Sequence, residues 1–385
     1  MTPSRVALRL LLSYALPRTK QKESLMRVLV TGHNGYIGSV MLPVLSDAGH
    51  TLTGLDTFLA EDCRLTADST LVPALRLDVR DVRVADLVGL DAVVHLAGVP
   101  DDPERLQETE SLAAINWRGA VHLAQRAREA GVSRFLYASS CSVYGPGPGD
   151  EPLTENAPLH PLTPDAIAKA NAEEGIARLA DSCFSPIILR AATAYGVSPR
   201  LRSDSILNHF VGRAHTTGRV RISGDGTTWR PLVHVEDIAY AFAAVLASPR
   251  EAFHGQVFNL GVTNENYQTM ELAEIVVGAV PGSTIERVPA SPPVDQASCR
   301  IDFGKLNRTL TTFRPRWNAA FGAKDLYATL QEVGVTHEDL QTRYNRPAQL
   351  RNLVQTGRVD ETFRWRDRAA LVHPEPSAPA LPRER

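Results

Sequence analysis

Two residues that could carry out acid–base chemistry lie one helical turn apart in the stretch TPDAIAKANAEE, residues 163–174. Asp165 and Lys169 are four residues apart, so on a helix they share one face and can form an ion pair. Thr163 and Pro164 suit the N-cap and first position of such a helix, where an acid in the first turn is also ordinary. The stretch therefore predicts a helix start in which Asp165 is either an acid–base group or a structural acid.

A glycine-rich turn near the start of the chain predicts a dinucleotide site. Gly32, Gly35 and Gly38 lie between the apolar run at 27–30 and an amphipathic segment. Glycines there permit a tight turn and a close backbone approach to a pyrophosphate, which the N-terminus of the next helix attracts. Asp56 ends the second apolar run, where a carboxylate accepts hydrogen bonds from ribose hydroxyls and repels a 2′-phosphate. We therefore expect NAD rather than NADP as the cofactor.

The elements that must position these residues are short apolar runs alternating with helix-sized segments. The runs are at 27–30, 51–55, 75–77, 92–98, 134–140 and 187–191. A helical pattern covers 113–132 and ends with Gly131 in a C-cap position. Such alternation is typical of parallel strands with right-handed crossovers. The sequence predicts an α/β fold with a doubly wound parallel Rossmann sheet and a smaller C-terminal substrate lobe.

The predicted organisation has four parts. They are an extension at 1–25, expected to be disordered; a dinucleotide-binding domain at 26–196, to which 237–261 return; a substrate lobe at 197–236 and 262–345; and a helix with a disordered tail at 346–385. The apolar segment at 6–16 is interrupted by Arg9 and is too short for a bilayer, which needs about 20 residues. We expect a loose N-terminal arm rather than an export signal.

Composition excludes several functions. The net charge of −2 gives no concentrated positive field, so neither nucleic acid nor a membrane surface is expected as a partner. The four cysteines are far apart and lack metal-ligand spacing, which predicts no metal site, no disulfide and a reducing cytoplasm.

Several motifs together resemble the extended short-chain dehydrogenase/reductases, and more narrowly the NAD-dependent nucleotide-sugar epimerases and dehydratases. They are TGxxGxxG, HLAG (95–98), YASSCSVYG (137–145), RPLVHVEDIA (230–239) and Lys169. The resemblance implies oxidation of a sugar hydroxyl, a nucleotide-sugar or nucleoside as substrate, and a homodimer. It implies cofactor contacts from Gly32, Asn34, Gly35, Tyr36, Ile37, Gly38, Asp56, Asp78, Val79, Leu96, Ala97, Gly98, Asn116 and Lys169. For Asp78 a surface turn is the alternative interpretation.

The resemblance also implies a catalytic serine, tyrosine and lysine, the last two spaced YxxxK. Ser140 and Lys169 match, but Asp165 occupies the tyrosine position, and no tyrosine in the chain precedes a lysine by four residues. Aspartic acid ordinarily has a pKa of about 3.9 against about 10 for tyrosine, which makes it a much weaker base. Pairing with Lys169 would favour the charged carboxylate of Asp165, whereas a dry pocket would favour its neutral acid form. Three hypotheses stay open: an acid–base group, a structural acid in an enzyme with its base elsewhere, or an NAD-binding sensor or scaffold without turnover.

Candidate substrate contacts combine the serine segment with loop residues. They are Ser140, Cys141, Ser142, Arg200, Asn208, Arg230 and Arg300. Arginine suits a diphosphate because its planar fork forms two parallel hydrogen bonds. The 4,6-dehydratases of this family carry an Asp-Glu pair where Cys141 and Ser142 stand, so that version of dehydration is not expected. Epimerisation and other eliminations stay open.

Overall fold

The computed structural model describes residues 25–68, 70–102, 109–147, 151–289 and 298–367. Most of the predicted N-terminal extension and of the predicted disordered tail lies outside these residues. No helix within the described ranges is long and apolar enough to cross a membrane.

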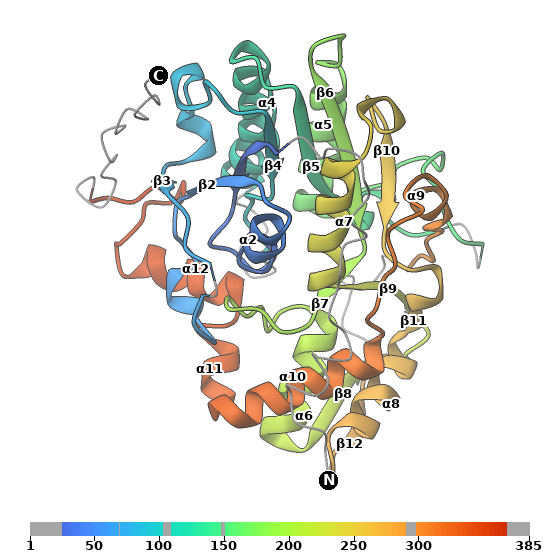
Figure 1. Cartoon of the computed structure of the whole chain (residues 1–385). Coiled ribbons are helices and arrows are strands. Elements are labelled where there is room, and N and C mark those ends of the chain that lie inside the picture. The colour runs from blue at the N-terminus through green and yellow to red at the C-terminus, as the bar shows by residue number, and fades with distance from the viewer. Residues whose placement is uncertain (1–24, 69, 103–108, 148–150, 290–297, 368–385) are drawn as a thin grey trace.

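A seven-stranded sheet with every neighbouring pair parallel forms the centre of the molecule (Figure 1). Its order is β10-β6-β5-β4-β1-β2-β3. The strands are β1 (Arg27–Thr31), β2 (Thr51–Asp56), β3 (Ala74–Arg76), β4 (Ala92–His95), β5 (Arg134–Ser140), β6 (Ser185–Ala191) and β10 (Val257–Leu260). All six predicted strands are confirmed, although the fourth ends at His95 and residues 96–98 form a loop.

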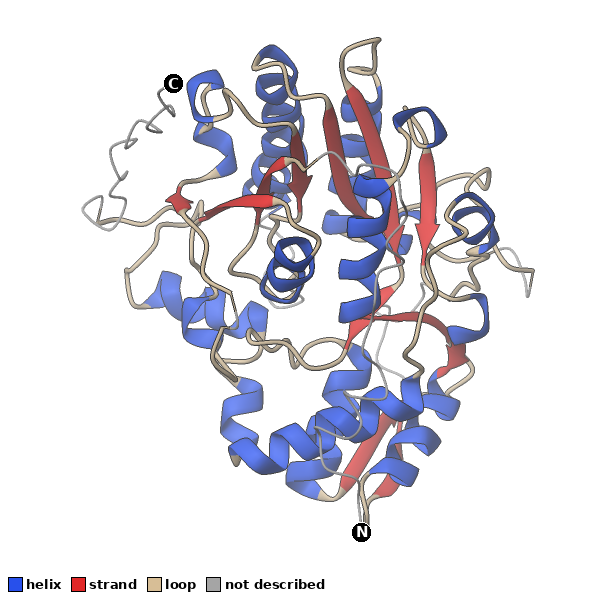
Figure 2. Ribbon diagram, viewed as in Figure 1, coloured by secondary structure: helices blue, strands red, loops and turns tan. Residues whose placement is uncertain are grey.

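Helices cover both faces of the sheet (Figure 2), as the doubly wound prediction requires. Val28 and Val30 share one core with α2 (Gly38–Asp47) and α7 (Val235–Ala247). Leu29 faces the other core, which contains α4 (Ala120–Glu129) and α5 (Pro164–Ala177). The alternation follows from the two-residue period of a strand buried on both faces.

The helical pattern at 113–132 is confirmed with an irregularity that the sequence did not reveal. α3 (Thr109–Ala113) continues through a π-helical segment, η4 (Ala114–Gly119), into α4. Gly131 follows the helix with φ +83°, a conformation that glycine adopts without strain. π-helical turns inside α-helices are frequent at functional sites, and this one carries Asn116.

The sheet and the helices on its two faces are taken together as one core, and a second hydrophobic core lies beyond the carboxyl ends of the sheet. Its helices and strands are α6 (Ile206–Thr217), α8 (Thr269–Ala279), α10 (Ala319–Val333), and the parallel pair β8 (Arg219–Ser223) and β12 (Thr284–Val288). A three-stranded sheet beside it joins β7 (Thr193–Tyr195), β9 (Trp229–His234) and β11 (Asn266–Gln268). The remaining helices are α9 (Gly304–Thr309), α11 (His337–Gln341) and α12 (Arg346–Gln355). The domain boundaries stated above stay a prediction.

Candidate active site

A cleft of about 590 Å³ lies where the strands of the large sheet end, between the two cores. Loops after β1, β2, β4 and β5 line it, and so does the start of α6. Thirteen of the fourteen predicted cofactor residues line this cleft, the exception being Asn34, and Ser140, Ser142 and Asp165 line it as well. The topology therefore brings the predicted cofactor and catalytic residues into one space.

The glycine turn has the shape that a bound pyrophosphate needs. Gly32 has φ +71°, and a Cβ added there would lie 2.8 Å from the backbone nitrogen of Ala97. A Cβ added at Gly38 would lie 2.2 Å from the Gly32 carbonyl oxygen. No described group accepts a hydrogen bond from the backbone N–H of Tyr36 or Ile37, beside the start of α2. These free donors and the helix N-terminus fit the phosphates of a dinucleotide.

The carboxylates beside this turn differ in how fully they are engaged. Asp56 accepts hydrogen bonds from the backbone N–H groups of Asn34 at 3.0 Å and Phe58 at 2.7 Å. Each oxygen keeps a lone pair, so Asp56 can still accept from a ribose hydroxyl. Asp78 accepts from Nε and Nη2 of the Arg80 guanidinium, at 2.9 Å and 2.6 Å. It lines the cleft, but the cofactor contact predicted for it competes with this ion pair.

Asp165 lies at the start of α5, in the helix predicted for it. Thr163 is the N-cap, and its hydroxyl oxygen accepts from the backbone N–H of Ala166 at 3.3 Å. Lys169 Nζ contacts Asp165 Oδ2 at 2.7 Å, which is the ion pair expected from the four-residue spacing. Asn116 Nδ2 donates to Asp165 Oδ1 at 2.8 Å. Both oxygens of the carboxylate are thus oriented, and its side chain stays 17% exposed at the cleft.

Asp101 is a cleft residue that the sequence reasoning missed. Its Oδ1 accepts from the backbone N–H of Asp165 at 2.8 Å, so it caps the helix that carries Asp165. Burial raises the pKa of the Asp101 carboxyl, and the neighbouring Asp165 charge raises it further, whereas hydrogen bonds from Thr163 and from Asp165 lower it. Its place in the loop after β4, at the carboxyl edge of a parallel sheet, was the signal available in the sequence.

A buried ion pair fixes the position of α5 against the sheet. Glu173, two turns after Asp165, accepts from Arg190 of β6 at 2.6 Å, and their side chains are 6% and 7% exposed. Glu173 also accepts from Ser139 of β5. These contacts hold the helix, and hence Asp165 and Lys169, over the ends of the two strands.

Ser140 faces the cleft and its neighbour Cys141 does not. Ser140 Oγ accepts from the backbone N–H of Ser142 at 3.1 Å, which leaves its hydroxyl hydrogen for a substrate oxygen. Cys141 is buried, its Sγ donates to the Arg190 carbonyl at 3.3 Å, and burial raises the pKa of its thiol. The structure therefore does not bring Cys141 to the cleft.

Four other predicted substrate residues also lie outside the walls of this cleft. Arg200 is buried and pairs with Asp68 at 2.8 Å. Asn208 accepts from the backbone N–H of Gly196 at 3.0 Å and donates to the Tyr36 hydroxyl at 3.1 Å, which joins the second core to the large-sheet domain. Arg230 is on β9, and Arg300 stacks over the ring of Trp229 at 4.7 Å. Their contact with substrate stays a prediction. The described residues contain no cluster of three or more His, Cys, Asp or Glu that could bind a metal.

Comparison with known proteins identifies the family. The model of the NAD dependent epimerase/dehydratase family matches residues 28–261. The chain belongs to this family. A UDP-glucose 4-epimerase of Mycolicibacterium smegmatis is 33% identical over 269 residues, which are 66% of this chain and 83% of that protein. A Bacillus subtilis protein described as an uncharacterized UDP-glucose epimerase, YtcB, is 31% identical over 61% of this chain and 77% of its own length.

Solved structures agree with the fold and the cofactor. A dTDP-glucose 4,6-dehydratase from Streptomyces venezuelae, crystallised with NAD, superposes with a TM-score of 0.69 at 25% identity. The match covers 82% of this chain and all of that one. NAD is therefore the cofactor of this family member, and the free amides at Tyr36 and Ile37 and the carboxylate of Asp56 fit it.

Proposed function

We propose that the protein is an NAD-dependent epimerase or dehydratase of a nucleotide-sugar or nucleoside, in which Asp165 occupies the position of the family's tyrosine. The observation that carries the proposal is the arrangement of Asp165, Lys169 and Asn116 in one cleft with the cofactor turn. The two sequence relatives act on UDP-glucose by their names, which favours a nucleotide-linked sugar.

The residues of the chain divide the chemistry between them. When bound, NAD supplies a reversible hydride acceptor at the substrate carbon. The Ser140 hydroxyl donates a hydrogen bond to the reacting oxygen of the substrate, and Asp165 accepts the proton that leaves this oxygen. Lys169 and Asn116 hold the two carboxylate oxygens, so each keeps one lone pair toward the cleft. Asp101 is a positioning residue, because it caps the helix start through the Asp165 N–H.

The test of this proposal is a turnover assay across a substrate panel. Purified protein with NAD is incubated with nucleotide-sugars and nucleosides, and the products are separated by chromatography and examined by mass spectrometry. Epimerisation gives a separable isomer of unchanged mass, because the same hydride returns to the carbon, whereas dehydration lowers the mass by one water. No conversion of any member of the panel, with NAD bound, would overturn the proposal.

A sensor or scaffold is the second candidate, and one observation favours it. Lys169 and Asn116 both donate to Asp165, so both oxygens of its carboxylate are already engaged by the protein. This candidate predicts NAD binding without substrate turnover in the wild type. Asp165→Tyr completes the YxxxK spacing with Lys169 and would then create turnover that the wild type lacks. Turnover by the wild type eliminates this candidate.

We also propose a homodimer formed through helices of the large sheet domain. Ile167 on α5 is 44% exposed and Leu162, just before that helix, is 52% exposed. A second copy could bury both. Light scattering at micromolar concentration should give twice the chain mass, and a monomer would refute the proposal.

A further inference from the structure

The last described segment, residues 346–366, returns from the second core to the β2–β3 edge of the large sheet (Figure 1). We call it the C-terminal strap. It consists of α12 and the turn that follows, which an antiparallel bridge between Val359 and Trp365 closes. It adds four residues to the wall of the cleft, namely Arg346, Gln349, Leu350 and Phe363.

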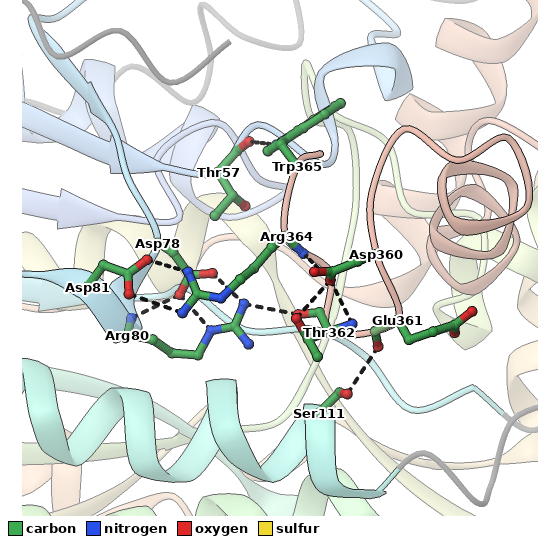
Figure 3. Close-up of polar contacts among 10 residues, drawn as sticks. All are labelled: Thr57, Asp78, Arg80, Asp81, Ser111, Asp360, Glu361, Thr362, Arg364 and Trp365. Carbon is green, nitrogen blue, oxygen red and sulfur yellow. Dashed lines mark hydrogen bonds and ion pairs between the residues drawn. The ribbon is translucent and has the colours of Figure 1, made fainter. Parts of the chain in front are cut away.

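The turn of the strap is bonded to the loops after β2 and β3 (Figure 3). Arg364 Nη2 contacts Asp81 Oδ1 at 3.0 Å, and Trp365 Nε1 donates to the Thr57 carbonyl at 2.6 Å. Arg80 donates to the Thr362 carbonyl at 2.9 Å while it pairs with Asp78. Asp56 ends β2 directly before the first of these loops, and Asp78 and Val79 follow β3, so the strap is fastened to the segments expected to hold the adenosine.

Further contacts join the strap to α3 and to the loop after β4, on the other side of the cleft from β2 and β3. Ser111 of α3 donates to the Glu361 carbonyl at 3.0 Å (Figure 3). On α12, Arg351 pairs with Asp102 at 2.6 Å, next to the Asp101 that caps α5. Leu350 and Phe363 are buried in the same core as Leu77 and Val79. The strap thus bridges both sides of one end of the cleft, with apolar side chains between.

Arg346 gives this wall a positive charge. Its side chain lines the cleft and the residue is 8% exposed, with no described carboxylate in ion-pair contact. Nη2 donates to the Arg200 carbonyl at 3.3 Å, and Nη1 is enclosed without a partner among the described residues. Burial lowers the pKa of this guanidinium, although the negative charges of Asp204 and Asp56 oppose the shift. A buried donor without a partner is costly, and a phosphate oxygen is a strong acceptor for it.

We propose that the C-terminal strap is part of the cofactor site: it closes over the adenosine diphosphate half of NAD, and Arg346 binds one of its phosphates. A reaction that oxidises and then reduces the same substrate consumes no net cofactor. Slow release of NAD is therefore useful, and a wall fastened to both sides of the adenosine end provides it.

The experiment measures cofactor retention and needs no turnover. The double variant Arg364→Ala/Trp365→Ala opens the turn, and Arg346→Gln removes the charge. Arg128→Ala is the control, because it breaks an exposed ion pair of 2.7 Å with Asp181 that is not in the cleft. Release of NADH is followed by stopped-flow fluorescence and binding of ADP-ribose by calorimetry, with circular dichroism to confirm folding.

We expect the double variant to release NADH about tenfold faster or more, and Arg346→Gln to weaken ADP-ribose binding about tenfold. Arg346→Lys should restore part of this loss, and the control should match the wild type. In the wild type, ADP-ribose should slow hydrogen exchange of the amides at 357–366, which tests the strap even if a variant fails to fold. Unchanged NADH release and unchanged exchange protection would overturn the proposal, and unchanged ADP-ribose affinity in Arg346→Gln would overturn the role of Arg346.

Discussion

Breaking the Arg190–Glu173 ion pair should destabilise the fold more than any exposed ion pair on the same helix. Arg190→Met removes the ion-pair partner of the Glu173 carboxylate, whose side chain is only 6% exposed and keeps a hydrogen bond from Ser139 of β5. Removal of one partner from a buried pair typically costs about 3–5 kcal/mol, because the other charge stays desolvated. We therefore expect the free energy of unfolding to fall by about 4 kcal/mol.

The assay is urea unfolding followed by circular dichroism, with two comparisons. Glu174→Gln breaks the exposed Glu174–Arg178 pair on the same helix and should cost at most about 1 kcal/mol. Arg190→Met/Glu173→Leu removes both charges and should be more stable than Arg190→Met alone. A loss below about 1 kcal/mol in the single variant, or no recovery in the double, would refute the reasoning that this pair holds α5.

Two further predictions concern the cofactor turn and a buried acid. Gly38→Ala places a methyl group 2.2 Å from the Gly32 carbonyl oxygen, so the turn must shift and NAD affinity by calorimetry should fall about tenfold or more. Unchanged affinity would show that the cofactor binds elsewhere. Burial raises the pKa of Asp237 to about 7, despite backbone hydrogen bonds from Arg316 and Trp317. Because the folded state holds this proton more tightly, its stabilising contribution is present at low pH and disappears as pH rises towards about 7. Urea titrations at several pH values measure the free energy of unfolding of the wild type and of Asp237→Asn. Between about pH 4 and pH 7 this free energy should fall by about 4 kcal/mol more in the wild type than in the variant. The same pH dependence in both proteins would contradict this.

Local patterns in the sequence were sufficient for the elements that carry the site. Apolar runs predicted the strands, and the TPD start together with the four-residue spacing predicted the α5 N-cap and the Asp165–Lys169 pair. Burial on both faces makes such strands continuous apolar runs, and helix geometry alone brings residues i and i+4 together.

The partners of polar side chains from distant segments could not be predicted in this way. Arg200 pairs with Asp68, 132 residues earlier in the chain, and no local pattern indicated this partner. Asp101 reaches the Asp165 N–H across 64 residues, and Arg346 reaches the cleft from the far end of the chain. Local sequence does not specify these contacts, because they depend on how the loops and the second core pack on the sheet.

The turnover rate with a substrate that the wild type converts tests the role of Asp165 most directly. Wild type, Asp165→Asn and Glu174→Gln are compared at saturating NAD and substrate. Positioned acid–base groups typically contribute 10²–10⁴-fold, so Asp165→Asn should convert the substrate about 100-fold more slowly or worse, while Glu174→Gln, which alters an exposed acid on the same helix, should match the wild type. Turnover by Asp165→Asn at the wild-type rate would contradict the account.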